Sequence, residues 1–309
     1  MTLPTGGTGG RWTRREPLAG DASTRRYTRL RDRAGGSAIL VEYPPDPPGT
    51  LARDLEVAGW LTSVGLRLPA VIDADPAAGW TLLEDLGADD AEASLRSAAG
   101  PQRAAMIAAL MEPLVQLSAQ APELLPSWNR PLDRDRLRWE LTGFELWFVR
   151  HRRGRVPDPK LGRWLDGLAS EVAAHPRRIC HRDYHLNNLF LLDEGGVAVI
   201  DAQDALVGPD TYDAVSLLEE RAMPELVSDA ERARWRQFWA ERTAAAAGWQ
   251  QRWALVRTQR ALKVLGTFAR LEEGGRGGYG GWLRAVATRL AADADGLALP
   301  AALVDLLLD

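Results

Sequence analysis

The spacing of apolar and polar residues changes along the chain, from strand-like near the N-terminus to helical after it. Residues 23–31 ("STRRYTRLR") and 37–43 ("SAILVEY") are typical of two strands around a glycine-containing turn. Residues 49–66 have apolar side chains at helical intervals and stop at a glycine. Residues 68–75 and 79–87 indicate two further strands. This first part therefore predicts a small, mostly antiparallel sheet with one helix.

From Gly87 onward the apolar spacing is mostly helical. The helical segments are residues 104–120, 135–152, 160–175, 211–222, 231–247, 251–271 and 280–294. The main strand-like interruption is residues 179–205. We therefore predict an α+β fold with a small antiparallel β N-terminal lobe, residues 1–86, and a larger, mostly helical C-terminal lobe, residues 87–309. A ligand is expected in a cleft between two such lobes.

Composition narrows the class of protein. The chain has 309 residues, 46% of them hydrophobic, which suits a folded globular protein of two lobes. A net charge of −4 argues against a nucleic-acid partner. No apolar run has the length of a membrane span, and the N-terminus lacks the layout of a signal peptide. The single cysteine, Cys180, excludes an internal disulfide. We expect a cytoplasmic enzyme or binding protein, with no membrane or obligate protein partner.

The residues that point to chemistry gather in residues 179–205, "ICHRDYHLNNLFLLDEGGVAVIDAQDA". Two apolar runs flank the turn sequence "DEGG", which predicts a β-hairpin. With the turn centred on the Glu194–Gly195 bond, Asn188 lies directly opposite Asp201 at the open end of the hairpin. An amide oxygen and a carboxylate held side by side suit Mg²⁺. Asp183, on the loop that leads into the hairpin, could then accept the proton of a hydroxyl that receives phosphate.

Two other interpretations of this segment stay open. Cys180, His181 and His185 could form a zinc site, although a fourth ligand at a usual spacing is missing. Alternatively, His181 only orients its loop through hydrogen bonds. We expect this role for His181 even if the protein is a kinase.

The segment resembles the catalytic loop of eukaryotic-type kinases, H-R-D-x-x-x-x-N, with a later aspartate for the metal. Longer stretches resemble the aminoglycoside phosphotransferase/choline kinase-like superfamily. Within it, they are most similar to bacterial kinases that act on the anomeric hydroxyl of N-acetylmuramate and N-acetylglucosamine. The stretches are "LAGDASTRRYTRL" (18–30), "LLEDLG" (82–87), "LRWELTGFELWF" (137–148), "HRDYHLNNL" (181–189), "VIDAQDALVGPDTYDAVSLL" (199–218) and "QRALKVLGTFARL" (259–271).

The resemblance implies a two-lobed protein-kinase-like fold that uses ATP and Mg²⁺. It assigns the proton acceptor to Asp183 and the metal ligands to Asn188 and Asp201, and it implies that Asp213 braces the catalytic loop. The chain departs from the group at residues 185–188, "HLNN" in place of H-S-R-N, which leaves the exact substrate open.

For the nucleotide, a short loop of small residues could lay backbone N–H groups against phosphates. The loop consists of Gly20, Asp21, Ala22, Ser23 and Thr24. No lysine precedes Lys160, so Arg25 or Arg26 must supply the positive charge that kinases place near the phosphates, and we favour Arg26. The resemblance also implies that the backbone of Glu84 and Leu86 binds adenine.

The acceptor side is predicted from residues after the metal ligand and on two helices. Gln203 and Asp204 are followed so closely by the next helix that no long activation segment fits, which favours a small-molecule sugar acceptor. Glu140, on a helix rich in aromatic residues, could bind sugar hydroxyls. Arg260, one helical turn from Lys263, could bind a carboxylate such as the lactyl group of N-acetylmuramate, or be a surface charge.

Our hypothesis from the sequence is an ATP- and Mg²⁺-dependent kinase for an N-acetylated amino sugar in peptidoglycan recycling. One alternative is a kinase for an aminoglycoside or an amino alcohol. The other is a catalytically dead nucleotide-binding protein, which the missing early lysine suggests.

Overall fold

The structure is a computed structural model that describes residues 11–18, 24–44, 49–220, 222–275 and 277–309. The chain divides into two compact units: unit 1 consists of residues 1–97 and 187–203, and unit 2 of residues 98–186 and 204–309. These units differ in two places from the lobes that we predicted with a boundary at residue 86. Unit 1 continues for about one more helix, and it contains the hairpin segment 187–203.

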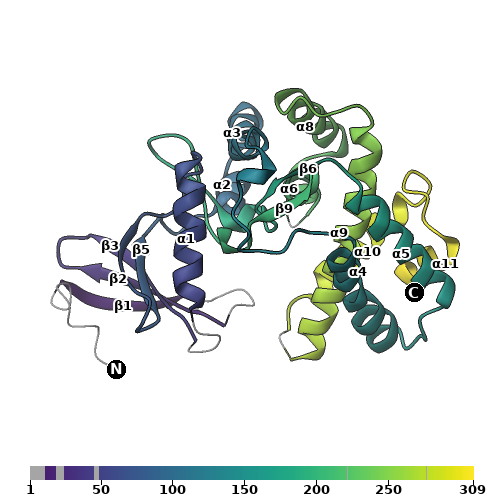
Figure 1. The fold of residues 1–309 in the computed structure, drawn as a ribbon, viewed down its shortest axis with the longest axis horizontal. Coiled ribbons are helices and arrows are strands. Elements are labelled where there is room, and N and C mark those ends of the chain that lie inside the picture. The colour runs from purple at the N-terminus through teal and green to yellow at the C-terminus, as the bar shows by residue number, and fades with distance from the viewer. Residues whose placement is uncertain (1–10, 19–23, 45–48, 221, 276) are drawn as a thin grey trace. The chain divides into compact units, whose positions relative to one another are not determined.

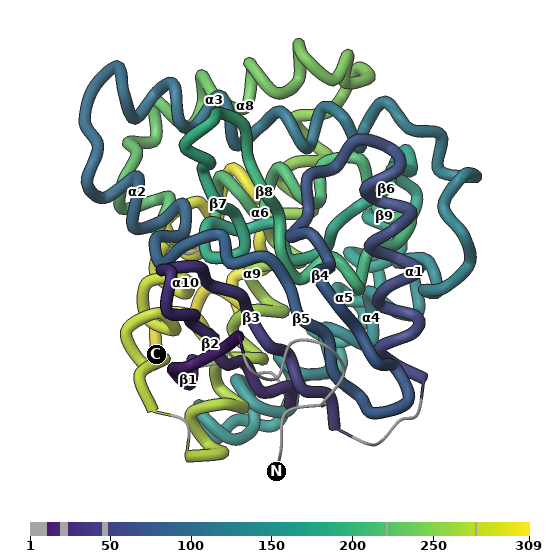
Figure 2. Tube along the Cα trace, turned by 90° about the vertical axis from the view of Figure 1, so that its left-hand side faces the viewer, coloured from purple at the N-terminus to yellow at the C-terminus, as the bar shows by residue number. Residues whose placement is uncertain are grey.

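Unit 1 is built on a five-stranded antiparallel sheet, which Figure 2 shows in the order β1-β2-β3-β5-β4. The strands are β1 (Trp12–Leu18), β2 (Arg26–Asp32), β3 (Ser37–Glu42), β4 (Val71–Asp75) and β5 (Trp80–Glu84). Its core consists of Trp12, Leu30, Ala38, Leu40 and Leu82. The predicted small antiparallel sheet is confirmed.

The sequence pattern did not predict β1. Only Trp12 of this strand is buried, and the next three residues are exposed, so the strand has no run of apolar residues or clear alternation. As an edge strand it pairs with β2 alone, and an edge position also accommodates Pro17, which has no N–H to donate. Backbone pairing rather than side-chain burial therefore holds β1.

Two helices and a hairpin complete unit 1. Helix α1 (Thr50–Ser63) lies beside the sheet in Figure 1 and buries Leu51, Asp54, Val57 and Leu61. Helix α2 is Ala91–Ser97, and the hairpin strands are β7 (Leu189–Leu191) and β8 (Val197–Val199). Asn187 Nδ2 donates hydrogen bonds to Asp90 Oδ2 at 3.0 Å and to Glu92 Oε2 at 3.2 Å. Asn187, for which the sequence suggested no role, thus ties the hairpin to the start of α2.

Unit 2 is mostly helical, as predicted. Its helices before the catalytic loop are α3 (Gly100–Ser118), the 3₁₀ turn η1 (Pro122–Leu124), α4 (Arg134–Gly143), the π-helix η2 (Phe144–Arg152) and α5 (Pro159–Ala173). After the loop come α6 (Tyr212–Glu219), α7 (Met223–Leu226), α8 (Asp229–Arg242), α9 (Trp249–Glu273), α10 (Gly280–Ala292) and α11 (Ala301–Leu308). Strands β6 (Arg177–Cys180) and β9 (Leu206–Pro209) pair antiparallel.

Capping residues in the sequence set several of these helix starts. At the start of α5, Asp158 precedes Pro159 and accepts a hydrogen bond from Lys160 N. At the start of α4, Asp133 accepts a hydrogen bond from Arg136 N. Ser228 and Glu231 form a capping box at α8. Each cap satisfies backbone N–H groups that have no partner within the helix.

We predicted a single helix over residues 135–152, but the structure divides this segment into α4 and η2. A close contact with a third helix lies where the two meet. The chain changes from α4 to the π-helix η2 at Gly143–Phe144, and α9 packs against this point. A Cβ built on Gly266 of α9 would lie 2.4 Å from Gly143 C and Phe144 N. Only glycine permits this approach, so the backbone contact fixes α9 against α4 and η2.

None of the helices in the described ranges has both the length and the apolar character that crossing a bilayer requires.

Candidate active site

The β7–β8 hairpin has a register one residue away from the predicted one. Leu191 pairs with Val197, and Leu189 with Val199, because the loop has three residues rather than two. The N–H of Gly195 donates to Leu192 O at 2.9 Å, and Gly195 takes a φ of 93°. This is the pattern of a type I turn followed by a left-handed residue. Asn188 therefore lies opposite Ile200, and the predicted pairing with Asp201 was wrong.

Asn188 and Asp201 nevertheless both lie at the open end of the hairpin, because Asp201 directly follows the residue opposite Asn188. Ile200 N donates to Asn188 O at 2.9 Å, and Asp201 follows directly. Asp201 adopts a φ of 60°, a left-handed conformation that is uncommon for residues other than glycine and that ends the strand alternation. Asn188 is buried, whereas the Asp201 side chain keeps 43% of its surface exposed. An exposed carboxylate held by an unusual backbone conformation is a feature found at functional sites.

The positive charge next to Asp201 comes from Arg25, not from the Arg26 that we favoured. A guanidinium nitrogen of Arg25 lies 3.6 Å from Asp201 Oδ1, and the other terminal nitrogen lies 3.8 Å from Asp54 Oδ2. The same guanidinium stacks over Tyr43, 5.4 Å from the ring centre. Arg26 is 73% exposed and pairs with Glu42. Arg26 is the first residue of β2, and Arg25 lies just before the strand.

The sequence analysis did not identify Asp54. Asp54 belongs to the buried face of α1, three residues from Leu51 and from Val57, and only 7% of it is exposed. Glu56, on the same helix, is exposed. A carboxylate at an apolar helical position was the available signal, because a buried charge needs a partner. Arg25 is that partner.

The predicted nucleotide-binding residues are described only in part. Gly20, Asp21, Ala22 and Ser23 lie outside the described residues, and Thr24 is exposed just before β2. In the predicted adenine segment, Glu84 N donates to Ala70 O at 2.9 Å, so this N–H is engaged within the sheet region. The Glu84 carboxylate accepts hydrogen bonds from Arg67 and from Ala70 N. Leu86 is partly buried just beyond the end of β5. A role for Glu84 and Leu86 in binding adenine stays a prediction.

In unit 2, backbone hydrogen bonds hold the loop that carries Asp183. Asp213, on α6, accepts hydrogen bonds from His181 N at 2.6 Å and from Arg182 N at 3.0 Å. Arg182 adopts a φ of 80°, and the fully buried Tyr184 donates its hydroxyl hydrogen bond to Leu110 O. The expected brace by Asp213 is confirmed. It fixes the backbone on the N-terminal side of Asp183, while Tyr184 fixes the C-terminal side.

The zinc alternative does not fit this loop. Cys180 is buried in β6, its thiol lies 3.5 Å from Pro209 O, and burial raises the pKa of the thiol well above its usual value. A zinc ligand has to be a thiolate. Throughout the described ranges, no three His, Cys, Asp or Glu side chains are grouped so as to hold a metal ion.

Asp183 is kept ionised by its surroundings. Burial alone would raise the pKa of this carboxyl, but Lys263, Arg182, Arg260 and His185 outweigh burial and hold the pKa well below its usual range. An ionised carboxylate can accept a hydrogen bond from a substrate hydroxyl and take its proton as the reaction proceeds.

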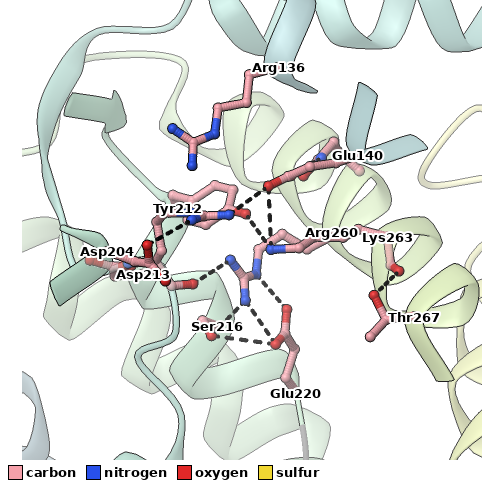
Figure 3. Close-up of polar contacts among 12 residues, drawn as sticks. Arg136, Glu140, Asp204, Tyr212, Asp213, Ser216, Glu220, Arg260, Lys263 and Thr267 are labelled. Atoms are coloured by element: carbon pink, nitrogen blue, oxygen red, sulfur yellow. Dashed lines mark hydrogen bonds and ion pairs between the residues drawn. The ribbon is translucent and has the colours of Figure 1, made fainter. Parts of the chain in front are cut away.

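Glu140 and Arg260, which we predicted to bind the sugar, instead form a buried network (Figure 3). Glu140 accepts hydrogen bonds from Arg182 at 3.0 Å and from Gln259 at 3.1 Å, and Lys263 Nζ lies 3.5 Å away. Burial would raise the pKa of Glu140, but Lys263 and Arg182 outweigh it and lower the pKa. The Glu140 side chain is only 3% exposed, so its carboxylate is committed to holding these side chains in place.

Arg260 is equally committed. It is 2% exposed and donates hydrogen bonds to both carboxylate oxygens of Glu220, to Ser216 Oγ at 2.9 Å, and to Arg182 O at 3.0 Å. Its last contact supports the backbone one residue before Asp183. The geometry therefore gives Arg260 a positioning role, and neither a surface charge nor a sugar contact describes it.

The two remaining acceptor-side predictions fall in different units. Gln203 belongs to unit 1, where its backbone oxygen accepts a hydrogen bond from Arg53 at 3.5 Å. Asp204 belongs to unit 2, and its carboxylate lies 3.8 Å from Arg182 with 41% of the side chain exposed. Asp204 thus keeps an accessible carboxylate within the same group of side chains as Asp183.

An antiparallel sheet with a buried Arg–Asp pair, followed by a helical unit with a braced H-R-D loop, defines a kinase-like phosphotransferase. The chain belongs to the phosphotransferase enzyme family (APH), whose sequence pattern matches residues 14–269.

Curated relatives and solved structures agree with this family. The chain is 33% identical over 304 residues to the N-acetylmuramate/N-acetylglucosamine kinase of Caulobacter vibrioides, covering 84% of this chain and 81% of the relative. It is 33% identical over 266 residues to the enzyme of the same name from Neisseria meningitidis serogroup B, covering 82% and 77%.

Among solved structures, the choline kinase of Streptococcus pneumoniae has a TM-score of 0.61 at 15% identity, with 94% of each chain covered. An aminoglycoside phosphotransferase of Streptomyces rimosus, in complex with ADP and streptomycin, has a TM-score of 0.57 at 19% identity, covering 81% and 92%. At these identities the likeness concerns the fold.

Proposed function

We propose that this protein is a cytoplasmic, ATP-dependent kinase that phosphorylates the anomeric hydroxyl of N-acetylmuramate, N-acetylglucosamine or both, as a step of peptidoglycan recycling. The observation that carries the proposal is the 33% identity, over 84% of the chain, to a kinase named for these two sugars. The braced Asp183 loop supports an active phosphotransferase, because Asp213 accepts hydrogen bonds from His181 N and Arg182 N and so fixes the backbone next to Asp183.

In this mechanism Asp183 accepts a hydrogen bond from the anomeric hydroxyl and directs its oxygen at the γ-phosphorus of ATP. A bond forms between the sugar oxygen and this phosphorus while the bond from phosphorus to the bridging oxygen of ADP breaks. The hydroxyl proton passes to Asp183. Because the transferred group carries most of the charge, catalysis depends on positioning and on neutralising that charge.

Asn188 and Asp201 would hold Mg²⁺, and their chemistry fits this ion. They offer an amide oxygen and a carboxylate at the open end of one hairpin. Mg²⁺ is commonly bound by one or two protein groups with phosphate oxygens and water completing the shell, so a denser cluster is not required. When bound, the ion neutralises charge on the phosphates. Arg25, 3.6 Å from Asp201, would add a fixed positive charge in place of the usual kinase lysine.

The side chains around Asp183 favour a neutral or acidic acceptor over a cationic one. The groups that shift the pKa of Asp183 most are the cations Lys263, Arg182 and Arg260. The nearby acids Glu140, Glu220 and Asp204 each face one of these cations, Glu140 and Asp204 through Arg182 and Glu220 through Arg260. Aminoglycosides and choline carry positive charge, which such surroundings repel. N-acetylated amino sugars have no basic amine, and they avoid this repulsion.

The test is turnover of a panel of acceptors by the purified protein. Release of ADP is followed with N-acetylmuramate, N-acetylglucosamine, kanamycin and choline, at fixed ATP and Mg²⁺. Phosphorylation at the anomeric position is checked by loss of the reducing end and by ³¹P NMR. We expect turnover with one or both amino sugars, lost in Asp183→Asn. Turnover of kanamycin or choline alone would replace this proposal, and retained ATP binding without any turnover would favour an inactive nucleotide-binding protein.

A further inference from the structure

Arg136 extends from the first turn of α4 into the charged group around Glu140. It lies four residues before Glu140, so the two side chains share one face of the helix. Figure 3 shows the guanidinium of Arg136 on the Tyr212 side of this group, with no interaction drawn from it to a carboxylate. Arg136 is partly buried, and Asp204, Arg182, Glu140 and Tyr212 are the charged or titratable groups that act on it most.

Unlike its cationic neighbours, Arg136 has no carboxylate partner in the described part of the chain. Its side chain donates one hydrogen bond, from Nη1 to Arg130 O at 2.6 Å. Arg182 and Lys263 both contact Glu140, and Arg260 is held by Glu220. In agreement with this geometry, burial first and repulsion by Arg182 second lower the pKa of Arg136, despite the attraction of Glu140 and Asp204.

A partly buried guanidinium without a matching anion costs free energy, which is offset when a ligand supplies that anion. The planar fork of arginine matches a carboxylate through two parallel hydrogen bonds. The donors of Arg260 are engaged by Glu220, Ser216 and Arg182 O, and Arg182 already contacts two carboxylates, those of Glu140 and Asp204. Arg136 is the arginine of this group that can offer its fork to a ligand.

We propose that Arg136 forms an anion subsite of the acceptor pocket and binds the carboxylate of an acidic sugar. This inference rests on the proposed function, and it names the ligand as the lactyl carboxylate that N-acetylmuramate has and N-acetylglucosamine lacks. It replaces our assignment of the same role to Arg260, which the buried contacts of Arg260 do not allow. Arg136 then sets the preference between the two sugars.

The test measures kcat and KM of Arg136→Ala and Arg136→Gln with both sugars. A charge-assisted hydrogen-bonded pair contributes about 1.5–3 kcal/mol, so kcat/KM for N-acetylmuramate should fall about 10- to 150-fold, mainly through KM. For N-acetylglucosamine we expect a change of less than about threefold. Arg134→Ala is the matched control, because Arg134 lies on the same turn, is 50% exposed and pairs with Asp135. The Arg134→Ala variant should leave kcat/KM for both sugars unchanged.

The carboxylate itself is tested with the methyl ester of N-acetylmuramate. The wild-type protein should bind the ester about as weakly as Arg136→Ala binds the acid. In Arg136→Ala, replacing the acid by the ester should weaken binding little further. Equal losses for both sugars, or an undiminished preference for the acid in both variants, would overturn the subsite while leaving the kinase activity established. Absence of turnover of either sugar by the wild-type protein would instead overturn the proposed function, and the subsite with it.

Discussion

The guanidinium of Arg25 lies between two carboxylates of unit 1, 3.8 Å from Asp54 and 3.6 Å from Asp201. Kinases usually pair a lysine of the sheet with a glutamate of the adjacent helix, and the lysine neutralises phosphate charge. Here Arg25, just before β2, pairs with an aspartate of α1. The absence of any lysine before Lys160 therefore does not exclude an ion pair of this kind.

We expect Arg25→Ala to reduce kcat/KM for ATP by at least about 100-fold, because one fixed charge near transferring phosphate contributes several kcal/mol. Arg26→Ala is the matched control, since it removes the same charge from the neighbouring position, where the side chain points to Glu42. It should keep activity within about threefold. The measurement is steady-state kinetics with varied ATP. An equal loss of kcat/KM in both variants would mean that the total charge of this segment, and not the position of Arg25, sets the activity.

The pKa of Asp183 predicts a pH profile. Since Lys263 is the first of the cations that lower this pKa, replacing it by methionine should raise the pKa. In the wild type, protonation of Asp183 should not reduce kcat/KM for the sugar anywhere between pH 5 and 8. In Lys263→Met the acid limb of kcat/KM should lie at higher pH than in the wild type. The variant's melting temperature is recorded alongside, because Lys263 also contacts the buried Glu140.

An unchanged acid limb in Lys263→Met would show that Asp183 does not control the rate at low pH. Asp183→Asn then serves as the second measurement. A group that accepts a proton in the transition state contributes about 10²- to 10⁴-fold, so its loss should reduce kcat by this factor with little change in melting temperature. A near-normal kcat in Asp183→Asn would remove this residue from the mechanism.

The sequence predicted the order and type of most elements, because apolar periodicity is strong where a face is buried. It failed where burial does not set the structure. Strand β1 has one buried residue, and its place depends on backbone pairing to β2. The hairpin register depended on a loop of three rather than two residues, a choice that "DEGG" alone does not determine.

For the site, the motif predicted which residue types are present but not which of two neighbours faces inward. Arg25 and Arg26 are chemically identical, and the sequence does not show that the Arg25 side chain is mostly buried while the Arg26 side chain is exposed. Arg260 was a candidate for substrate binding because it lies one helical turn from Lys263. Its partners are Ser216 of α6 and Glu220, the residue just after α6, and no local sequence pattern indicates a contact between segments so distant in the chain.

His175 makes stability depend on pH. It is 7% exposed, and burial, with Arg252 and Arg177 nearby, lowers the pKa to about 4 from an ordinary 6.5, although Asp210 opposes the shift. The unfolded chain binds more protons than the folded one between pH 4 and 6.5, so stability is lost on acidification through this window. At pH 4.5 the loss attributable to His175 is about 2–3 kcal/mol relative to pH 7.

Urea unfolding at pH 4.5, 5.5 and 7 measures this effect. His175→Phe cannot take up a proton, so its free energy of unfolding should fall less than that of the wild type between pH 7 and 4.5. Parallel curves for the two proteins would mean that the pKa of His175 is not lowered by folding.

The contact of Gly266 with the Gly143–Phe144 backbone predicts a large cost for a single methyl group. In Gly266→Ala the new Cβ would lie 2.4 Å from backbone atoms of another helix, where no side chain can move aside. We expect a destabilisation of about 1–3 kcal/mol or more, measured by urea unfolding. Because α9 carries Lys263 and Arg260 next to Glu140 of α4, forcing the helices apart should also reduce kcat/KM for the sugar.

Gly167→Ala is the matched control for this prediction. Gly167 lies within α5, and a Cβ added there would meet no atom within 4 Å. Replacing an exposed helical glycine by alanine stabilises a helix by about 0.5–1 kcal/mol, so this variant should be as stable as the wild type or more so, with unchanged kinetics. If Gly266→Ala behaved in the same way, α9 and α4 would not be in backbone contact, and the packing that places Lys263 and Arg260 beside Glu140 would need another explanation.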